Sequence, residues 1–356
     1  MERLVIRPSV AIMIRPDTPE NLRLKVFYSS GTKRLEVLMP AEYSQEINKL
    51  IKYGIDATAI REGSTFWPED VVKLAREFRK RGILVSEQHD SQKWKGCYDR
   101  YDRQLRLLSE MLPEDTSPVD SQKELMNKRI VIIGLGGMGS NILQSLAQMG
   151  FSSFLLIDPD IVELSNLNRQ PIYTRRDVGA KKVVAASNWL GCFVDNVVVE
   201  TFCGTLKEAL AKKVITRYTP EIMVNCADVP SVLDTTRKIL TKVTNNVPVL
   251  VGGGYYLFKS FIGPLIIPGK TACLDCNLPK GLTDFPQNIP AIGGNIAPVV
   301  SIGASISALN VFKYFTRCAP CDLCNKQIIM SLDKLRFEER ILNRDESCPT
   351  CSRFGE

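Results

Sequence analysis

A glycine-rich stretch at residues 134–139 constrains the fold of this chain more than any other feature. It reads Gly-Leu-Gly-Gly-Met-Gly and lies between a β-branched run, residues 129–133, and an apolar segment typical of a helix, residues 140–149. Glycine lets the backbone turn tightly and approach phosphate oxygens, while the following helix directs free N–H groups at the anion. The sequence therefore predicts a strand–turn–helix unit that binds a nucleotide through four glycines, Gly134, Gly136, Gly137 and Gly139.

Alternating strands and helices continue after this turn. Residues 154–157 complete a βαβ unit, which implies a parallel sheet. Other apolar runs predict buried strands at residues 197–199, 222–225 and 249–251, an apolar helix at 301–315, and a strand pair at 328–332 and 335–341. We therefore expect an α/β fold class, with a Rossmann-like domain and a mainly parallel sheet at residues 128–356.

Residues 1–90 have the pattern of a separate α+β module. Strands are expected at residues 5–14, 22–28, 34–38 and 83–85, and helices at 41–52 and 69–80. This order favours a winged-helix-like module. Residues 91–127 are polar, contain Pro113 and Pro118, and are expected to connect the two domains. The only histidine, His89, is expected to be an exposed linker residue beside this connection.

Composition narrows the classes of protein. With 356 residues and 44% hydrophobic content, the chain can form two domains with large cores. Its formal net charge of +7 is spread along the sequence without a long basic run, so we expect no nucleic-acid partner. We also expect no signal peptide, no membrane span and a cytoplasmic protein, in which the eleven cysteines stay reduced or bind metal.

Charged residues after the glycine turn decide between two nucleotide-binding classes. Asp158 lies nineteen residues after Gly139 and suits a ribose hydroxyl in either a dehydrogenase or an ATP enzyme. Arg169 and Lys182 follow, and a cationic cluster suits a triphosphate better than a nicotinamide dinucleotide. Asp228 ends a later predicted strand, where a carboxylate is a natural Mg²⁺ ligand. ATP with Mg²⁺ is therefore the expected ligand.

These residues occur in the order found in a known family. The glycine turn, Asp-Pro-Asp-Ile-Val-Glu-Leu-Ser-Asn-Leu-Asn-Arg-Gln at residues 158–170 and Gly-Ala-Lys-Lys at 179–182 resemble the ThiF/MoeB/ubiquitin-activating family of adenylating enzymes, over about residues 95–356. The resemblance implies that Asp158 binds ribose, Lys182 binds phosphate and Asp228 binds Mg²⁺. Four more residues belong to the implied site, the last three around the phosphates: Asp160, Asn166, Arg169 and Gln170.

Residues 100–104 read Arg-Tyr-Asp-Arg-Gln and resemble the family's Arg-Tyr-x-Arg-Gln segment. In the family, the second arginine of this segment reaches into the ATP site of the partner subunit. The resemblance therefore implies that Arg103 acts in trans and that the chain forms a homodimer. The implied catalytic set is Arg103, Arg169, Lys182 and Asp228.

Two Cys-x-x-Cys pairs can each present two thiolates to a tetrahedral Zn²⁺. They consist of Cys273, Cys276, Cys348 and Cys351. The separation between the pairs is long for a zinc ribbon, and the family resemblance is what implies a zinc site there. Because four sulfur ligands leave no open position, this zinc would be structural.

An enzyme thioester is not expected. Ubiquitin-type activators need an acceptor cysteine, and the corresponding loop, about residues 277–298, contains none; its prolines and glycines are typical of a lid. Three cysteines are expected to be small buried hydrophobes, Cys192, Cys203 and Cys226. Three others are expected to be inert thiols, with metal binding as the alternative: Cys318, Cys321 and Cys324.

The front module and the missing acceptor cysteine resemble the peptide-modifying subgroup of the family, in which such a module holds a precursor peptide by strand addition. The resemblance implies antibiotic biosynthesis on a ribosomally made peptide, whose glutamate side-chain carboxylates are adenylated and then cyclise to a bicyclic product. Three alternatives stay open: adenylation of a peptide C-terminus, a sulfur-carrier adenylyltransferase, and a non-catalytic binding subunit. Joint retention of the four implied catalytic residues argues against the last.

Overall fold

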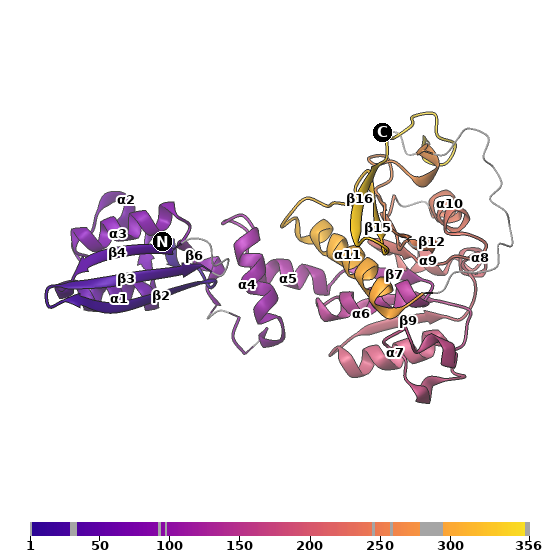
Figure 1. Ribbon diagram of the computed structural model, residues 1–356, viewed down its shortest axis with the longest axis horizontal. Helices are drawn as coiled ribbons and strands as arrows, with labels where there is room; N and C mark the ends of the chain where they lie inside the picture. The colour runs from indigo at the N-terminus through magenta and orange to yellow at the C-terminus, as the bar shows by residue number, and fades with distance from the viewer. Residues whose placement is uncertain are drawn as a thin grey trace. The chain divides into compact units, whose positions relative to one another are not determined.

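The structure is a computed structural model and describes residues 2–28, 34–91, 94–96, 98–243, 246–256, 259–277 and 295–352. Contacts divide the chain into two compact units, Met1–Lys123 and Glu124–Glu356 (Figure 1). Each unit has a hydrophobic core of its own. The expected lid loop, residues 277–298, falls for the most part outside the described residues.

The first unit contains two small antiparallel sheets. One sheet has the order β5–β1–β6, with strands Ile55–Asp56, Arg3–Ile6 and Leu84–Ser86. The other has the order β2–β3–β4, with strands Val10–Thr18, Asn21–Tyr28 and Arg34–Pro40. The single strand expected at residues 5–14 is thus two strands, because a turn closed by the Val10 N–H and the Arg7 carbonyl separates them.

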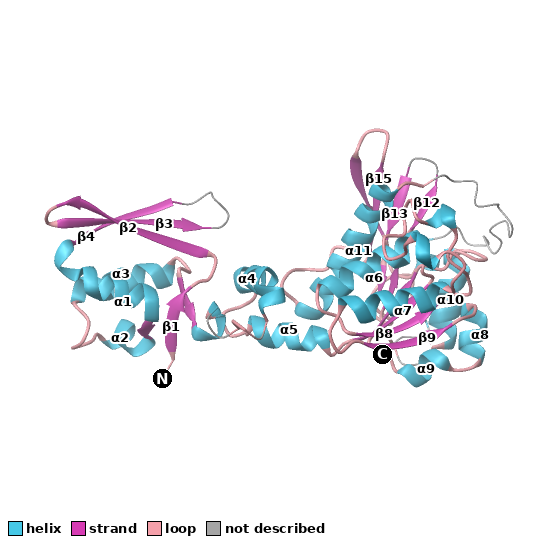
Figure 2. Ribbon diagram, turned by 90° about the horizontal axis from the view of Figure 1, so that it is seen from below, coloured by secondary structure: helices cyan, strands magenta, loops and turns pink. Residues whose placement is uncertain are grey.

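Three helices complete the core of this unit: α1 (Ser44–Tyr53), α2 (Ala57–Glu62) and α3 (Glu69–Lys80). Figure 2 shows the β2–β3–β4 sheet lying across α1 and α3. Leu24 and Val26 of β3 are fully buried in one cluster with Leu50 of α1 and Phe78 of α3. The buried residues of α1 and α3 recur at intervals of three or four residues along each helix, as expected for helices with one apolar face.

The segment expected to be a connection is largely helical, with α4 (Asp102–Met111) and α5 (Pro118–Met126). Trp94 is fully buried, and its Nε1 donates to Asp102 at 3.2 Å. The expectation of an exposed His89 is wrong: its side chain is completely buried, with Nδ1 2.9 Å from Ser109 Oγ of α4. Burial, and then the charge of Arg7, lowers the pKa of His89.

The second unit is built on a six-stranded sheet with the order β14–β11–β10–β7–β8–β9. Its strands are, in chain order, β7 (Arg129–Ile133), β8 (Ser153–Ile157), β9 (Val198–Phe202), β10 (Ile222–Asn225), β11 (Val249–Val251) and β14 (Leu265–Ile266). Five strands are parallel, and β14 is antiparallel to β11. The predicted α/β class with a mainly parallel sheet is confirmed.

The strand order reverses at β7. From β7 the chain moves through β8 to β9, and then returns to place β10 on the other side of β7. The helices of this unit are α6 (Gly137–Gln148), α7 (Lys182–Phe193), α8 (Leu206–Ala211), α9 (Val214–Tyr218), α10 (Val232–Lys242) and α11 (Ala297–Thr316). In open parallel sheets, ligands bind beyond the carboxyl ends of the strands at such a reversal. A ligand-binding site is therefore expected beyond the carboxyl ends of β7 and β10.

A second, antiparallel sheet packs beside α11. Its order is β12–β13–β15–β16, with strands Gly254–Tyr256, Lys259–Ile262, Lys326–Ser331 and Arg336–Ile341. Helix α11 includes the apolar helix predicted at residues 301–315, and among the described residues it alone is long and apolar enough to span a membrane. However, 56% of its apolar window is buried inside the protein, as in a core helix.

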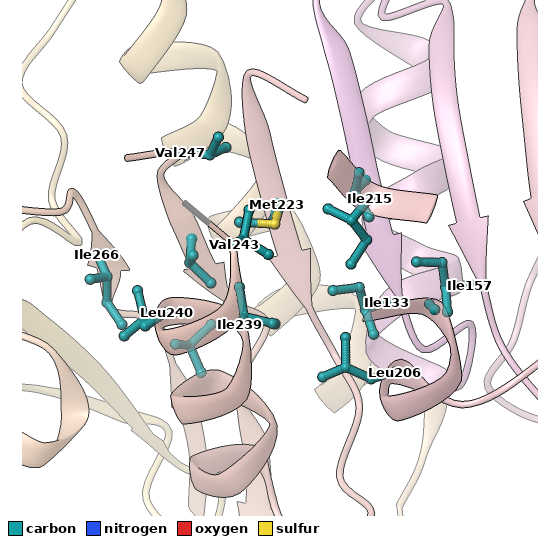
Figure 3. Close-up of a cluster of buried hydrophobic side chains, with 14 of the residues drawn as sticks. Ile133, Ile157, Leu206, Ile215, Met223, Ile239, Leu240, Val243, Val247 and Ile266 are labelled. Carbon is teal, nitrogen blue, oxygen red and sulfur yellow. The ribbon is translucent and has the colours of Figure 1, made fainter. Parts of the chain in front are cut away.

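Buried aliphatic side chains from β7, β8, β10 and the helices around them form a hydrophobic core of this unit (Figure 3). Ile133 and Ile157 pack with Leu206 of α8, while Met223 packs with Ile239 of α10. One expectation fails at the sheet edge. The strand predicted at residues 197–199 is β9, but it is not buried, because it lies at the end of the sheet and has only one neighbour.

Candidate active site

The glycine turn joins β7 to α6, as predicted. Gly134 has a left-handed backbone, with φ of 87°, and a Cβ there would lie 2.8 Å from the backbone carbonyl of Cys226 at the end of β10. A Cβ at Gly139 would overlap the Gly134 carbonyl oxygen. These two glycines are therefore required by the fold itself, since the turn packs tightly on itself and on the end of β10.

The two middle glycines differ from each other. A Cβ at Gly137 would lie 3.3 Å from Val300 and 3.7 Å from Cδ of Arg169. At Gly136, the residue just before α6, a Cβ would meet no described atom within 4 Å. Packing gives no reason for glycine there, whereas an anion that approaches the backbone N–H groups at the start of α6 does. The turn therefore fits a phosphate group.

Asp158 follows the last residue of β8, and its buried side chain supports the glycine turn. Its side chain is buried, and its two oxygens accept the N–H groups of Leu135 at 2.6 Å and of Asp160 at 2.8 Å. Burial raises the pKa of the Asp158 carboxyl, while the charge of Lys182 acts in the opposite direction. Tyr173, which the sequence analysis missed, adds a second support by donating its hydroxyl to the Leu135 carbonyl at 3.1 Å.

Asp160 and Lys182 form an ion pair beside Asp158. The Lys182 Nζ lies 2.8 Å from Oδ2 of Asp160, and the Lys182 backbone N–H donates to the Asp160 carbonyl at 3.0 Å. The lysine side chain is 8% exposed and the aspartate side chain 61% exposed. Of the two aspartates, Asp160 thus has the carboxylate open to an incoming ribose or phosphate, and Lys182 is the cation held next to it.

The backbone of Arg169 is joined to the turn by Asn141, a helix residue that the sequence analysis missed. Asn141 of α6 donates its Nδ2 to the carbonyl of Gly137 at 2.8 Å and to that of Arg169 at 2.9 Å. Arg169 donates Nη1 to the Ser165 carbonyl at 2.9 Å. The Oε1 of Gln170 is buried and has no hydrogen-bond partner among the described residues, which leaves it open to a ligand donor.

Asn166 has a supporting position in this segment. Its side chain is buried, and its Oδ1 accepts the N–H of Glu163 at 3.1 Å in a reciprocal cap of a short 3-10 turn, residues 164–166. The carbonyl of Asn166 also accepts the backbone N–H groups of Arg169 and Gln170 at 3.0 Å each. Asn166 therefore fixes the loop that carries these two side chains.

Asp228 lies just beyond the carboxyl end of β10 and is exposed. Asn225, the last residue of β10, donates Nδ2 to the hydroxyls of Thr235 and Thr236 at 2.9 Å, and its Oδ1 accepts the N–H of Ala227 at 3.2 Å. The loop is thus tied to α10, and it follows a strand whose end contacts Gly134. An exposed carboxylate at this edge suits a hard cation such as Mg²⁺.

Arg103 is exposed on α4 in the first unit. The neighbouring Asp102 pairs with Arg106 at 2.9 Å, one turn further along the helix, and this hydrogen bond is the main cause that lowers the pKa of Asp102. Gln104 pairs with Gln122 of α5. The charge of the exposed Arg103 also lowers the pKa of Asp102, as a smaller cause.

The four predicted zinc ligands come together. The Sγ atoms of Cys273, Cys276, Cys348 and Cys351 all lie within 4.8 Å of one another, with separations of 3.8, 3.6 and 3.3 Å for the three closest pairs. A tetrahedral zinc with bonds of about 2.3 Å requires sulfurs about 3.8 Å apart, so this cluster fits the ion. It is the only such group among the described residues. Burial raises the pKa of Cys273 and that of Cys351, so a bound cation would stabilise the thiolate form of these two side chains.

An ion pair behind the cluster was not predicted. Asp275, between the first two cysteines, accepts both Nε and Nη2 of Arg237, at 2.8 and 2.6 Å. It also accepts the hydroxyl of Thr350, between the second two cysteines. One carboxylate thus holds both pairs and α10 together. No local sequence signal reveals this arrangement, since Arg237 is 38 residues from Asp275.

Two expectations for the remaining cysteines are wrong. Cys192 and Cys203 are exposed, not buried, because they lie near the ends of α7 and of the edge strand β9. Cys226 is partly buried under the turn, and burial, with the charge of Asp228, raises its pKa to about 12. A thiol with this pKa is a poor nucleophile at neutral pH.

Residues 101–350 match the ThiF family. The chain belongs to the ThiF family. Among its relatives, the adenylyltransferase and sulfurtransferase UBA4 of Candida albicans is 28% identical over 224 residues, 62% of this chain and 48% of that protein. The sulfur carrier protein adenylyltransferase of Thermus thermophilus is 27% identical over 265 residues, 71% of this chain and 90% of that protein. The chain thus spans about half the length of its UBA4 relatives.

Two solved structures resemble this chain over nearly its whole length. PaaA has a TM-score of 0.65 and 24% identity, and the match covers 94% of this chain and 98% of that one. Escherichia coli MccB, solved with MccA, has a TM-score of 0.71 and 22% identity, with 99% and 100% covered. At these identities the likeness shows the fold, and it includes residues 1–90, which precede the family match.

Proposed function

We propose that this chain is an ATP-dependent adenylating enzyme that activates a carboxylate of a ribosomally made precursor peptide. The carboxylate attacks the α-phosphate of ATP, which gives an acyl-adenylate and pyrophosphate, and a second nucleophile of the same peptide then displaces AMP. The observation that carries the proposal is the likeness to MccB and PaaA over nearly the whole chain, including the front unit. The ion pair and turn beside β7 support the ATP part of it.

Each part of the site has a role in this reaction. The turn at Gly136 and the start of α6 suit a phosphate, and Arg169 and Lys182 neutralise charge as pyrophosphate departs. Asp228 would hold Mg²⁺, whose charge would lower the repulsion between the phosphates and an incoming carboxylate. We propose that a ribose hydroxyl binds at the two aspartates, with the open carboxylate of Asp160 as its partner and Asp158 behind it. The four-cysteine cluster would hold a structural zinc ion apart from the chemistry.

The proposed reacting group is a glutamate side chain, as in a PaaA-like conversion of adjacent glutamates into a fused bicycle. MccB-like adenylation of a peptide C-terminus is the alternative within the same class. Mass spectrometry of a candidate precursor after incubation with enzyme and Mg-ATP distinguishes them. Loss of water or CO₂ indicates cyclisation, whereas a mass gain by AMP indicates adenylation of the terminus. Stoichiometric ADP in place of AMP would contradict both, because it would mean an acyl phosphate.

The front unit is proposed to bind the precursor peptide. Strands β2 and β4 lie at the two edges of their sheet, and an edge strand offers unpaired N–H and C=O groups to an extended peptide. Calorimetry should therefore detect binding of the leader region to the full chain. Substitution of proline for Ile12 within β2 should weaken binding if this edge is used, while ATP binding stays unchanged. Equal turnover by a folded variant without residues 1–90 would refute the role.

Adenylation of a sulfur-carrier protein is a second candidate. It is favoured by the sulfur carrier protein adenylyltransferase of Thermus thermophilus, since the match covers 90% of that protein's length. The decisive comparison is ATP–pyrophosphate exchange stimulated by a precursor peptide or by a small carrier protein ending in Gly-Gly. Stimulation by the carrier alone would replace the peptide proposal.

We further propose a cytoplasmic homodimer in which Arg103 completes the ATP site of the other subunit. Mixing inactive Arg103→Ala protein with inactive Asp228→Ala protein should restore part of the activity, since hybrid dimers contain one intact site. Full activity of a strictly monomeric protein, measured by light scattering during turnover, would exclude the arrangement.

A further inference from the structure

One buried amide on α6 joins three segments that surround the glycine turn. The Nδ2 of Asn141 donates to the carbonyl of Gly137 at 2.8 Å and to that of Arg169 at 2.9 Å, while its Oδ1 accepts the hydroxyl of Ser301 of α11 at 2.9 Å. We propose that Asn141 is a positioning residue, which holds Arg169 at the phosphate-binding turn and has its own orientation set by Ser301. This role rests on the proposed function, in which Arg169 neutralises charge as pyrophosphate departs.

The hydrogen-bond partners leave one orientation for this amide. Gly137 and Arg169 both offer carbonyl oxygens, which can only accept, so the atom that faces them has to be the nitrogen with its two N–H groups. The opposite atom is then the oxygen, and the Ser301 hydroxyl is its donor. Because Asn141 is buried, removal of the amide would take from the two carbonyls a partner that bulk water does not replace.

The guanidinium of Arg169 moves with its own loop. Its Nη1 donates to the carbonyl of Ser165 and to Oδ1 of Asn168, both at 2.9 Å. The backbone N–H of Arg169 donates to the Asn166 carbonyl at 3.0 Å. These three contacts fix the arginine relative to its own loop and not relative to the glycine turn. The contact with Asn141 joins the loop to the turn, so it sets where the guanidinium lies.

Helix α11 packs against the same place. A Cβ at Gly137, the first residue of α6, would lie 3.3 Å from Cγ1 of Val300 and 3.7 Å from Cδ of Arg169. Val300 and Ser301 are neighbours near the N-terminal end of α11. This helix thus contacts the turn through Val300 and the amide of Asn141 through Ser301. A change at Ser301 is therefore expected to reach Arg169 through Asn141.

The expected effect concerns the charge that develops as pyrophosphate leaves. Misplacement of a reacting or stabilising group by about 1 Å can lower a rate about 10²-fold. Free pyrophosphate carries more negative charge than the same two phosphates do within ATP, so its binding should depend more strongly on Arg169. Binding of ATP, which also uses the glycine turn and Lys182 in the proposed site, should change little.

The first test is a double-mutant cycle on the binding of magnesium pyrophosphate to the full-length protein. Calorimetry measures the Kd of the pyrophosphate that a non-hydrolysable ATP analogue displaces. Arg169→Ala should raise this Kd about 10-fold or more, and Asn141→Ala should reproduce a large part of the increase. The double variant should bind no more weakly than Arg169→Ala alone, because Asn141 acts through the arginine.

A matched control lies one turn further along α6. The hydroxyl of Ser145 donates to the backbone carbonyl of Asn141 at 3.0 Å, so Ser145→Ala removes a hydrogen bond to the same residue without touching its amide. This variant should bind pyrophosphate as the wild type does.

The second test changes the hydroxyl on α11. Ser301→Ala leaves the Asn141 amide without its donor and should weaken pyrophosphate binding, but only while Arg169 is present. Ser301→Thr keeps a hydroxyl and should restore wild-type binding. This comparison serves equally well if Asn141→Ala does not fold.

Two results would overturn the proposal: an effect of Asn141→Ala that persists in the Arg169→Ala background, or equal binding by Ser301→Ala and Ser301→Thr. Failure of the proposed function has a different signature. In that case the wild-type protein itself would bind no pyrophosphate that the ATP analogue displaces, and the phosphate site would be wrong together with the role of Asn141.

Discussion

Replacement of Gly136 by alanine tests the role of this glycine in ligand binding separately from its role in folding. A Cβ at this position meets no described atom within 4 Å, and the backbone angles, φ −71° and ψ −154°, are open to alanine. Replacement of a helix N-cap glycine by alanine lowers the stability of the folded protein by about 1 kcal/mol. Alanine also restricts the unfolded chain, which offsets about 0.4–1 kcal/mol of this loss. The free energy of unfolding should therefore change by less than about 1 kcal/mol.

Binding of ATP should respond differently. If phosphate oxygens approach the Gly136 backbone, an added methyl group overlaps them, and such overpacking costs about 1–3 kcal/mol. At about 1.4 kcal/mol per tenfold change, the Kd for a non-hydrolysable ATP analogue should rise roughly 5- to 150-fold. Calorimetry of Gly136→Ala, with thermal unfolding of the free protein alongside, measures both effects.

Two further substitutions control this experiment. Gly191→Ala, on α7, also meets no described atom within 4 Å and should leave the Kd unchanged. Gly139→Ala should prevent folding, because its Cβ overlaps the Gly134 carbonyl oxygen. A Gly136→Ala protein that binds the analogue as tightly as the wild type would refute the reasoning, since phosphate then does not lie against this residue.

Three other perturbations have defined outcomes. Arg237→Ala leaves the buried carboxylate of Asp275 without its cation, so urea unfolding should show about 1–3 kcal/mol less stability, and zinc affinity, measured by competition with a chelator, should fall about 10- to 100-fold. Burial depresses the folded pKa of His89, so stability should fall as the pH drops below about 6.5, and His89→Gln should flatten this slope in denaturant titrations. Arg169→Ala should lower kcat about 10²- to 10³-fold with little change in ATP binding. The control Arg175→Ala, at an exposed position, should leave kcat unchanged. Equal effects of the two substitutions on kcat would contradict an electrostatic role of Arg169 in the transition state.

The central sheet was predictable because its signals are local. The strands at residues 129–133, 222–225 and 249–251 begin and end as the apolar runs predicted. The four metal-type cysteines were predictable too, since each Cys-x-x-Cys pair is complete within four residues. Burial was harder to predict, because it depends on what packs around a residue: His89 packs against Ser109 of α4, and β9 has no outer neighbour among the described strands.

Residues that support the site gave no comparable signal. Asn141 has the spacing of an ordinary core position of α6, and only the folded chain shows it joining the carbonyls of Gly137 and Arg169. The same holds for the contact between Arg237 and Asp275. Such groups connect segments that are far apart in the sequence. A single sequence does not show which residues of those segments come together in the fold.

The distance along the chain between the two cysteine pairs has a consequence for how the protein is made. Cys273 and Cys348 are 75 residues apart, as are Cys276 and Cys351. At about 5–20 residues per second, a ribosome needs roughly 4–15 s to synthesise this interval. During that time the first pair can offer a metal ion only two thiolates. Full coordination, and with it the fixing of α10 through Asp275, is therefore a late event in synthesis, and an early supply of zinc cannot advance it.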